Sequence, residues 1–285
     1  MFLRNVQSQV IGRPASDGAG VRLTRVFGGQ GLPRLDPFLM LDEFDSADAN
    51  DYIAGFPAHP HRGFETVTYM LEGRMLHEDH LGNQGLLQNG GAQWMTAAHG
   101  IIHSEMPQQV EGRMRGFQLW VNLPASEKMG PAGYRDLGPE ELGHGTLADG
   151  SRITVIAGRF DDGQQHIDGP IQGKSTEPVF IDLELAAGAS TTPRLPRSHT
   201  VLMYVYEGAV TVKSQDGETV LPKGRLALFG DGDAVALDSL SGGRALLLAG
   251  KPLREPIVQY GPFVMNSHDE IEQALRDYRD GVFAG

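Results

Sequence analysis

Short apolar runs, each bounded by glycine, proline, aspartate or asparagine, recur along the chain. They alternate with polar residues or run continuously for a few positions, as strands of a sandwich or barrel do. The clearest runs are "GVRLTRVFG", "TVTYMLEG", "GFQLWVNLP", "RITVIAG", "VFIDLELAAG", "HTVLMYVYEGAVTVKS" and "RALLLAG". The 38 glycines and 17 prolines favour many short elements joined by tight turns over long helices. The pattern predicts an all-β protein.

One stretch near the C-terminus, "SHDEIEQALRDYRDG", has a helical pattern instead. Ser267, with Glu270 three residues later, is a capping-box signature for the start of a helix. Apolar residues follow at helical spacing: Ile271, Ala274, Leu275 and Tyr278. Gly281 is suited to end the helix. We therefore expect one short C-terminal helix whose apolar stripe packs on a β domain.

The chain also contains an internal repeat. "YMLEG" at 69–73 aligns with "YVYEG" at 204–208 at an offset of 135, and "LQNGGAQWM" from Leu87 aligns with "LPKGRLALF" from Leu221 at 134. Two matches at nearly one offset predict two copies of one β-fold, each of about 130 residues, an ordinary domain size. The junction, "PEELGHGTLADGS", is rich in glycine and small polar residues, as linkers are.

These patterns set the predicted domain boundaries. Residues 1–138 form an N-terminal barrel and residues 139–151 a linker. Residues 152–285 form a second barrel with the terminal helix. The length of 285 residues also accommodates one large β domain, so the division depends on the repeat.

Composition narrows the function. The formal charge is 24 − 36 = −12, and an acidic chain without a Lys/Arg run is poorly suited to bind a phosphate backbone directly. Contact with a DNA-bound protein is not excluded. The chain has no cysteine, which excludes disulfides, thiolate metal sites and cysteine nucleophiles. The start, "MFLRNVQSQVIGRP", lacks the apolar run of a signal peptide, and nowhere do 18 apolar residues follow one another. We expect a cytoplasmic protein with no membrane partner.

Two histidine-bearing stretches carry the candidate chemistry. His59 and His61 stand two residues apart in "FPAHPHRGF", and His103 and Glu105 have the same spacing in "GIIHSEMP". Residues i and i+2 of a strand share a face, so all four side chains converge if these strands are neighbours. Three imidazoles and one carboxylate suit Fe, Ni, Cu, Mn or Zn. A six-coordinate ion would keep two positions for water, substrate or dioxygen, which supports metal-assisted chemistry.

The alternative is that these histidines are hydrogen-bonded core residues, and a single HxH pair is weak evidence against it. Two pairs at equal spacing, each beside strand-like sequence, favour the metal site. The repeat provides a comparison within the chain. At offsets of 135 and 134 the four candidates map, in order, to Arg194, Pro196, Leu237 and Ser239. The fold therefore does not require them, and we predict a function specific to the first half.

Longer strings resemble the pirin family of the cupin superfamily over nearly the whole chain. They are "LDPFLMLDEF" (35–44), "HPHRGFETVTYMLEG" (59–73), "HEDHLGNQG" (77–85), "WMTAAHGIIHSEMP" (94–107), "FQLWVNLP" (117–124) and the terminal "DYRDGVFAG". The resemblance implies a bicupin, with two jelly-roll barrels packed face to face. It also implies one metal, usually Fe(II), in the N-terminal barrel. Ni, Cu, Mn, Co and Zn are compatible with the same ligands.

The resemblance also implies residue roles. The family's three histidines and one glutamate correspond to His59, His61, His103 and Glu105. Glu65 occupies the place of the usual cupin glutamate ligand but is not a ligand in pirins, and we expect it to orient a ligand or line the strand. His80 and His99 are expected in solvated loops, outside the coordination sphere.

Pirin-type quercetin 2,3-dioxygenases suggest the leading function. The substrate would be a flavonol and O2, the product would form with release of carbon monoxide, and Glu105 would be the catalytic base. An iron-dependent, redox-sensing regulator that binds transcription factors or metabolic enzymes is the alternative. A third reading is an enzyme whose natural substrate is not a flavonol. We expect a monomer, because two facing barrels can satisfy one another.

Overall fold

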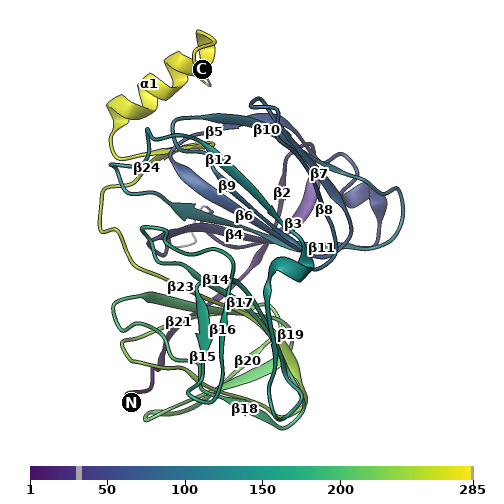
Figure 1. The fold of residues 1–285 in the computed structure, drawn as a ribbon, viewed down its shortest axis with the longest axis vertical. Helices are drawn as coiled ribbons and strands as arrows, with labels where there is room; N and C mark the ends of the chain where they lie inside the picture. The colour runs from purple at the N-terminus through teal and green to yellow at the C-terminus, as the bar shows by residue number, and fades with distance from the viewer. Residues whose placement is uncertain (30–33, 284–285) are drawn as a thin grey trace. The chain divides into compact units, whose positions relative to one another are not determined.

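A computed structural model describes residues 1–29 and 34–283 of the chain, and the last two residues of the terminal motif lie outside this range. The chain forms two compact units. Unit 1 contains Met1–Gly12 and Glu140–Pro252, and unit 2 contains Arg13–Pro139 and Leu253–Gly285. The ribbon in Figure 1 is coloured along the chain, so that both segments of each unit can be followed.

The units are not contiguous in sequence, which differs from the predicted division. The chain passes between them at 139/140, within the predicted linker, and again at 12/13 and 252/253. The N-terminal strand β1 (Val6–Ile11) pairs with β21 (Arg225–Phe229) of unit 1. Its partner is more than 200 positions away, and this pairing has no signature in the local pattern.

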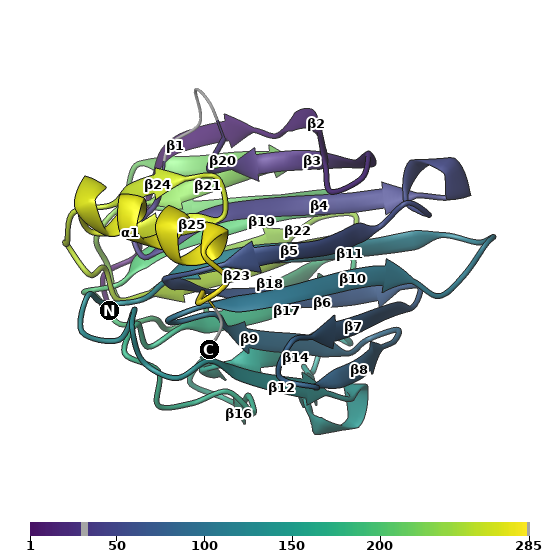
Figure 2. The ribbon, with the colours of Figure 1, turned by 90° about the horizontal axis from the view of Figure 1, so that it is seen from above.

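Unit 2 is a β-sandwich. A seven-stranded sheet has the order β12-β9-β6-β11-β4-β3-β2, and a four-stranded sheet has the order β5-β10-β7-β8. Figure 2 shows β5, β10 and β7 in succession. The bounds are β2 Arg13–Asp17, β3 Val21–Phe27, β4 Phe38–Ser46, η1 Ala49–Asp51, β5 Phe56–His61, β6 Phe64–Glu72, β7 Met75–Asp79, β8 Gln84–Leu87, β9 Ala92–Thr96, β10 Ile101–Pro107, β11 Met114–Asn122 and β12 Gly133–Leu137. The short helix η2 (Pro139–Glu141) crosses the boundary to unit 1. The later segment adds β24 Val258–Tyr260, β25 Phe263–Met265 and α1 His268–Arg279.

Unit 1 repeats this arrangement. Its main sheet has the order β1-β21-β19-β23-β17-β14-β13, and β18, β22, the end of β19 and β20 form the second layer. The remaining bounds are β13 Gly143–Thr146, β14 Arg152–Ala157, β15 Arg159–Asp161, β16 His166–Asp168, β17 Val179–Leu185, β18 Ala189–Thr191, β19 Thr200–Ser214, β20 Gly217–Pro222, β22 Ala236–Ser239 and β23 Gly243–Gly250. A large aliphatic cluster fills this unit.

The terminal helix is confirmed. Ser267 is the N-cap of α1, and the capping box with Glu270 is present. Ile271 is buried with Phe263 of β25, but Leu275 is 38% exposed and Tyr278 is 45% exposed. The packed stripe is therefore narrower than the sequence predicted, because the helix lies on the small β24–β25 hairpin and not on a broad sheet.

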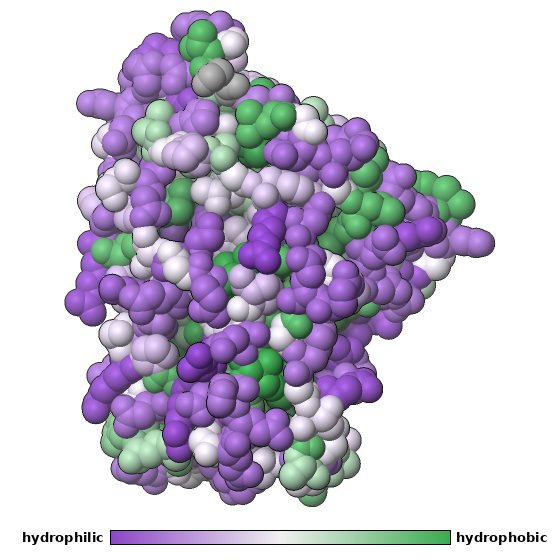
Figure 3. Space-filling model, viewed as in Figure 1, coloured by the Kyte–Doolittle hydropathy of each residue, from purple (hydrophilic) through white to green (hydrophobic). Residues whose placement is uncertain are grey.

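The exposed side chains are mainly polar. The face in Figure 3 is largely hydrophilic with small hydrophobic patches, in keeping with the acidic composition. Within the described residues, the structure has no helix that is both long and apolar enough to span a membrane.

Candidate metal centre

Strand pairing in unit 2 brings the two histidine stretches together. β5 carries His59 and His61, β10 carries His103, and these strands are antiparallel neighbours. His103 lies directly opposite His59, and Ile101 lies opposite His61. The sequence predicted this convergence on the condition that the strands were adjacent.

The three histidines form one cluster. One ligand nitrogen of each lies within 4.8 Å of the others, and the Nε2 atoms of His59 and His61 are 3.0 Å apart. Two imidazole nitrogens bound at right angles to one ion, each at about 2.1 Å, would be separated by about 3.0 Å. The spacing therefore fits a shared metal ion.

The proton positions also fit a metal. The Nδ1–H of His59 donates to the carbonyl oxygen of Pro57 at 2.8 Å, which leaves Nε2 of His59 as a lone pair facing the cluster. The Nε2 of His103 is buried and has no hydrogen-bond partner among the described residues. A buried nitrogen of this kind is costly unless a ligand satisfies it.

Burial keeps the imidazoles of His61 and His103 neutral. The pKa of His61 lies well below its usual value, first because of burial and then because of His59. The pKa of His103 is lowered in the same way, by burial and then by His61, His59 and His77. Desolvation disfavours the charged form, and a neutral imidazole is the form that binds metals.

Glu105, the predicted fourth ligand, lies two residues from His103 but has other partners in this structure. Its Oε1 accepts a hydrogen bond from Thr68 at 3.1 Å, and its Oε2 accepts one from Gln118 at 2.9 Å. The β5–β10 register shifts between His103 and Glu105, so that Glu105 pairs with Phe56. The role of Glu105 as a ligand stays a prediction.

The other predicted residues lie outside the histidine cluster. Glu65 is buried on β6 and accepts a hydrogen bond from Thr96 at 2.6 Å. The Nδ1 of His80 accepts from the backbone of Ile102, and the Nδ1–H of His99 donates to the carbonyl oxygen of Gly130. Both histidines lie in turns and support local backbone structure.

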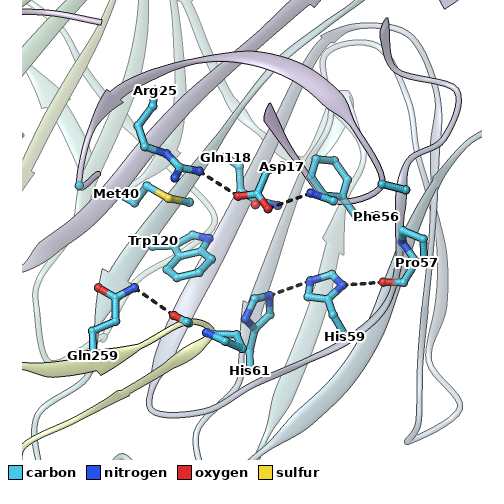
Figure 4. Close-up of a pocket in the computed structure, with 15 residues that line it drawn as sticks. Asp17, Arg25, Met40, Phe56, Pro57, His59, His61, Gln118, Trp120 and Gln259 are labelled. Atoms are coloured by element: carbon cyan, nitrogen blue, oxygen red, sulfur yellow. Dashed lines mark hydrogen bonds and ion pairs between the residues drawn. The ribbon is translucent and has the colours of Figure 1, made fainter. Parts of the chain in front are cut away.

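A pocket of about 610 Å³ opens beside the cluster, entirely within unit 2. Figure 4 shows His59 and His61 side by side along one wall, with Trp120 next to His61. Phe56 and Met40 add apolar surface. Ligand sites commonly combine such apolar walls with a few polar groups, in volumes of about 300–1,000 Å³.

Arg25 and Gln118, two polar residues of the pocket, have partners of their own. Arg25 contacts Asp17 at 2.9 Å and binds Asp42 through two nitrogens, at 2.9 and 2.8 Å. Hydrogen bonding to Asp42 is the main cause that raises the pKa of Arg25. Gln118 faces the pocket and holds Glu105. The charge of Arg25 is therefore already balanced by carboxylates.

The C-terminal segment supports the histidine strand. Arg62, directly after His61, is buried and binds Asp277 of α1 at 2.6 Å. It also donates to the carbonyl oxygen of Phe283 at 3.1 Å, and its guanidinium lies 4.3 Å from the centre of the Phe283 ring. The return of the chain to unit 2 thus fixes the end of β5 beside the cluster.

His77, a neighbour of the cluster, is not among the residues that the sequence pattern predicted for the site. It lies on β7, and its Nδ1 is 3.3 Å from Nδ1 of His103. A signal was present in "HEDH", where His77 and Asp79 have the same i, i+2 spacing as the two predicted pairs. The side chains of His77 and Asp79 are both buried.

Comparisons with known proteins agree with this architecture. Family models described as "Pirin" and "Pirin C-terminal cupin domain" match residues 20–121 and 180–284. A Pseudomonas aeruginosa protein named "Putative quercetin 2,3-dioxygenase" is 64% identical over 281 residues, covering 99% of this chain and 98% of that protein.

Two solved structures extend the comparison. A quercetin 2,3-dioxygenase from Acinetobacter baumannii is 32% identical, with a TM-score of 0.88 and 99% of each chain covered. A bacterial pirin from Escherichia coli, in complex with nickel(II), has a TM-score of 0.66 over 86% of this chain and 99% of that chain. At 18% identity it shows the common fold only. The family models, the relative and the matching fold together confirm two cupin domains with a short C-terminal helix, and the chain belongs to the pirin family.

Proposed function

We propose that this protein is a metal-dependent dioxygenase that opens the heterocycle of a flavonol such as quercetin with O2 and releases carbon monoxide. The observation that carries the proposal is the cluster of His59, His61 and His103 beside a pocket of about 610 Å³. A metal that only braced the fold would need no adjoining pocket of this size. The quercetin dioxygenase names of the relatives supply the substrate class.

The histidines would hold the metal as neutral donors. A bound divalent metal would act as a Lewis acid that favours the ionised substrate hydroxyl. Three imidazoles and a carboxylate are compatible with several ions, of which we propose Fe(II). The nickel(II) in the related pirin fold is compatible with the same kind of site.

Glu105 would receive the proton of the flavonol 3-hydroxyl. Hydrogen bonds from Thr68 and Gln118 fix both carboxylate oxygens, and Gln118 also faces the pocket. A positioned general base contributes about 10²–10⁴-fold to a rate. Glu105 would also complete the ligand set, with a change in its hydrogen bonds when metal is bound.

The pocket walls suit a planar, uncharged aromatic ring system. Trp120 and Phe56 offer apolar faces, and the guanidinium of Arg25 is neutralised by two carboxylates. A substrate carrying a carboxylate or phosphate would find no unpaired partner in Arg25.

Aerobic turnover of quercetin by the iron-loaded protein tests the proposal. Loss of flavonol absorbance and release of carbon monoxide should both require metal, and the His59→Ala/His61→Ala double variant should show neither. Metal binding without turnover, tried with iron, nickel, copper and manganese, would contradict the dioxygenase and favour the regulatory alternative.

Glu105→Gln tests the base separately. We expect this variant to retain part of its metal binding and to lose about 10²–10⁴-fold in turnover. Glu43→Gln, a change of another buried glutamate in unit 2, is the matched control and should leave turnover intact. Unchanged turnover of Glu105→Gln would exclude Glu105 as the base.

A further inference from the structure

A chain of buried polar groups lies behind His103. The Nδ1 atoms of His103 and His77 are 3.3 Å apart, and the Nε2 of His77 is 3.5 Å from Oδ2 of Asp79. Strand register brings these polar groups together. β10 pairs with β7 so that His103 lies opposite Asp79 and Glu105 lies opposite His77. The side chains of His77 and Asp79 are 1% and 0% exposed.

The turn after β7 holds Asp79 rigidly. Its Oδ1 accepts the backbone N–H groups of Leu81 and Asn83, both at 3.0 Å, and its Oδ2 accepts from the side-chain amide of Asn83 at 2.8 Å. Every one of these contacts needs an acceptor, as an ionised carboxylate provides. Asp79 therefore presents an acceptor oxygen to His77.

The ring of His77 is held on its other side by Tyr134. The two rings stack with centroids 4.3 Å apart and an interplanar angle of 26°. Gly85, opposite His77 on β8, makes room, because a Cβ there would lie 2.0 Å from the Tyr134 hydroxyl and 1.7 Å from Asp136. The string "HEDHLGNQG" thus supplies His77, its carboxylate partner, the turn and the glycine.

The proton positions in the row His103–His77–Asp79 follow from the carboxylate at its end. The Nε2 of His77 makes no hydrogen bond among the described residues, but it lies 3.5 Å from the carboxylate oxygen Oδ2 of Asp79. An N–H at this position is attracted to the carboxylate and a lone pair is repelled by it, so we place the proton of His77 on Nε2 and the lone pair on Nδ1. The Nδ1 of His103 must then be the donor to His77. Its own Nε2 is left unprotonated and buried in the histidine cluster.

We infer that His77 and Asp79 are positioning residues that fix the tautomer of His103, so that its Nε2 is always free to bind the metal. This inference rests on the proposed metal site. Partners of this kind set the orientation and basicity of a metal-bound histidine, and their loss typically costs about 10–100-fold in metal affinity. In the same cluster, His59 is oriented separately, by the Pro57 carbonyl.

Asp79→Asn is the sharpest test because it is nearly isosteric. Its amide oxygen would take the place of Oδ1, which two backbone N–H groups require, and its NH2 would then face Nε2 of His77. His77 would shift its proton to Nδ1, and His103 would carry a proton on Nε2, where it blocks the metal. A wrong tautomer set by the same substitution disables the serine protease triad while its geometry is retained.

The measurement is zinc affinity by competition with a chromophoric chelator, with 15N NMR of the imidazoles in zinc-free and zinc-loaded protein. We expect His103 of the wild type to be protonated at Nδ1 in both states. Asp79→Asn should weaken zinc binding about 10–100-fold, with a zinc-free spectrum that shows the Nε2–H form of His103.

Two further variants separate this role from fold support. Asn83→Ala removes the amide hydrogen bond to Oδ2 of Asp79 but keeps the carboxylate and its two backbone hydrogen bonds, so zinc affinity should be unchanged. His77→Phe keeps the ring stacked on Tyr134 but removes the acceptor. It should weaken zinc binding less than Asp79→Asn, because His103 then has no imposed tautomer, although it is the larger steric change.

Two outcomes would overturn the inference. One is an Nε2–H tautomer of His103 in the zinc-free wild type, and another is equal zinc affinity of Asp79→Asn and Asn83→Ala. The zinc-free spectrum tests the effect of His77 and Asp79 on the tautomer of His103 even if the wild type binds no metal. Failure of the wild type to bind metal would contradict the metal site itself. Quercetin turnover is not needed for either conclusion.

Discussion

Units 1 and 2 have the same strand order, but corresponding strands place polar side chains in the interior of unit 2 and aliphatic side chains in the interior of unit 1. In unit 2, β10 lies between β5 and β7, and His103 pairs with His59 on one side and Asp79 on the other. In unit 1, β22 lies between β18 and β19, and Leu237 pairs with Thr191 and Val212. Leu237 and Val212 belong to the aliphatic core.

The difference shows what the fold requires and what it only permits. Aliphatic side chains satisfy the interior of unit 1 by packing. Unit 2 places imidazoles in the same layer and leaves the Nε2 of His103 without a hydrogen-bond partner among the described residues. A buried donor or acceptor without a partner costs about 1–3 kcal/mol. Unit 2 loses this stability and gains candidate ligand atoms beside a pocket.

The largest effect should come from a change in the packed unit. Leu237→Ala leaves a cavity among aliphatic neighbours, and we expect a loss of about 2–5 kcal/mol in the free energy of unfolding. Urea denaturation measures it. Zinc affinity of the folded protein should not change, because the proposed ligands belong to unit 2. A weaker zinc site in folded Leu237→Ala would show that the units are not functionally separate.

Placing the unit 1 residue in unit 2 is the reverse experiment. His103→Leu removes a proposed ligand and should weaken zinc binding by at least about 100-fold, beyond the loss caused by a supporting residue. His199→Leu, which changes a buried histidine of unit 1, is the matched control and should bind zinc normally. Calorimetric titration compares them, and equal affinities would exclude His103 from the site.

Acid should destabilise the zinc-free protein. The pKa values of His61 and His103 are lowered in the folded state, so below about pH 6.5 the unfolded chain binds protons that the folded chain does not. Stability is then lost as the pH falls from about 6.5 towards the folded-state pKa values, by up to about 1.4 kcal/mol per pH unit for each histidine.

Unfolding free energies measured in chelator between pH 7 and 5 test this slope. His199 in unit 1 contributes in the same direction, because its pKa is also lowered. His103→Leu should remove the contribution of one group, and bound zinc should make the protein more sensitive to acid, since protons and metal compete for the same nitrogens. A wild-type slope equal to that of His103→Leu would contradict the buried, neutral state of His103.

The smallest effect should come from the helix that only unit 2 carries. Ser267→Ala removes the N-cap of α1 and should cost about 1 kcal/mol. Arg62 still binds Asp277 and Phe283 in this variant, so the end of β5 should stay in place. Thermal unfolding measures the loss of stability, and zinc titration measures whether the site is intact. A loss of zinc affinity would indicate that the cap itself supports the site.

The internal repeat illustrates how far the sequence pattern reaches. It correctly identified two copies of one fold, but a constant offset assigned Arg194 to the position of His59. By strand pairing the residue that faces Leu237 is Thr191, as His59 faces His103. Loops of different length separate corresponding strands in the two units, so one offset does not apply throughout.

The sequence by itself determined the strands, the terminal helix and the histidines that share a face, because alternation, capping and the i, i+2 relation are local properties. The tertiary structure decided which strands are neighbours, and with them the unit each terminus joins. It also decided that Glu105 binds Thr68 and Gln118 and that His77 lies against His103. These contacts join residues 13 to 37 positions apart, and their geometry follows from strand pairing, register and packing, which no local pattern encodes.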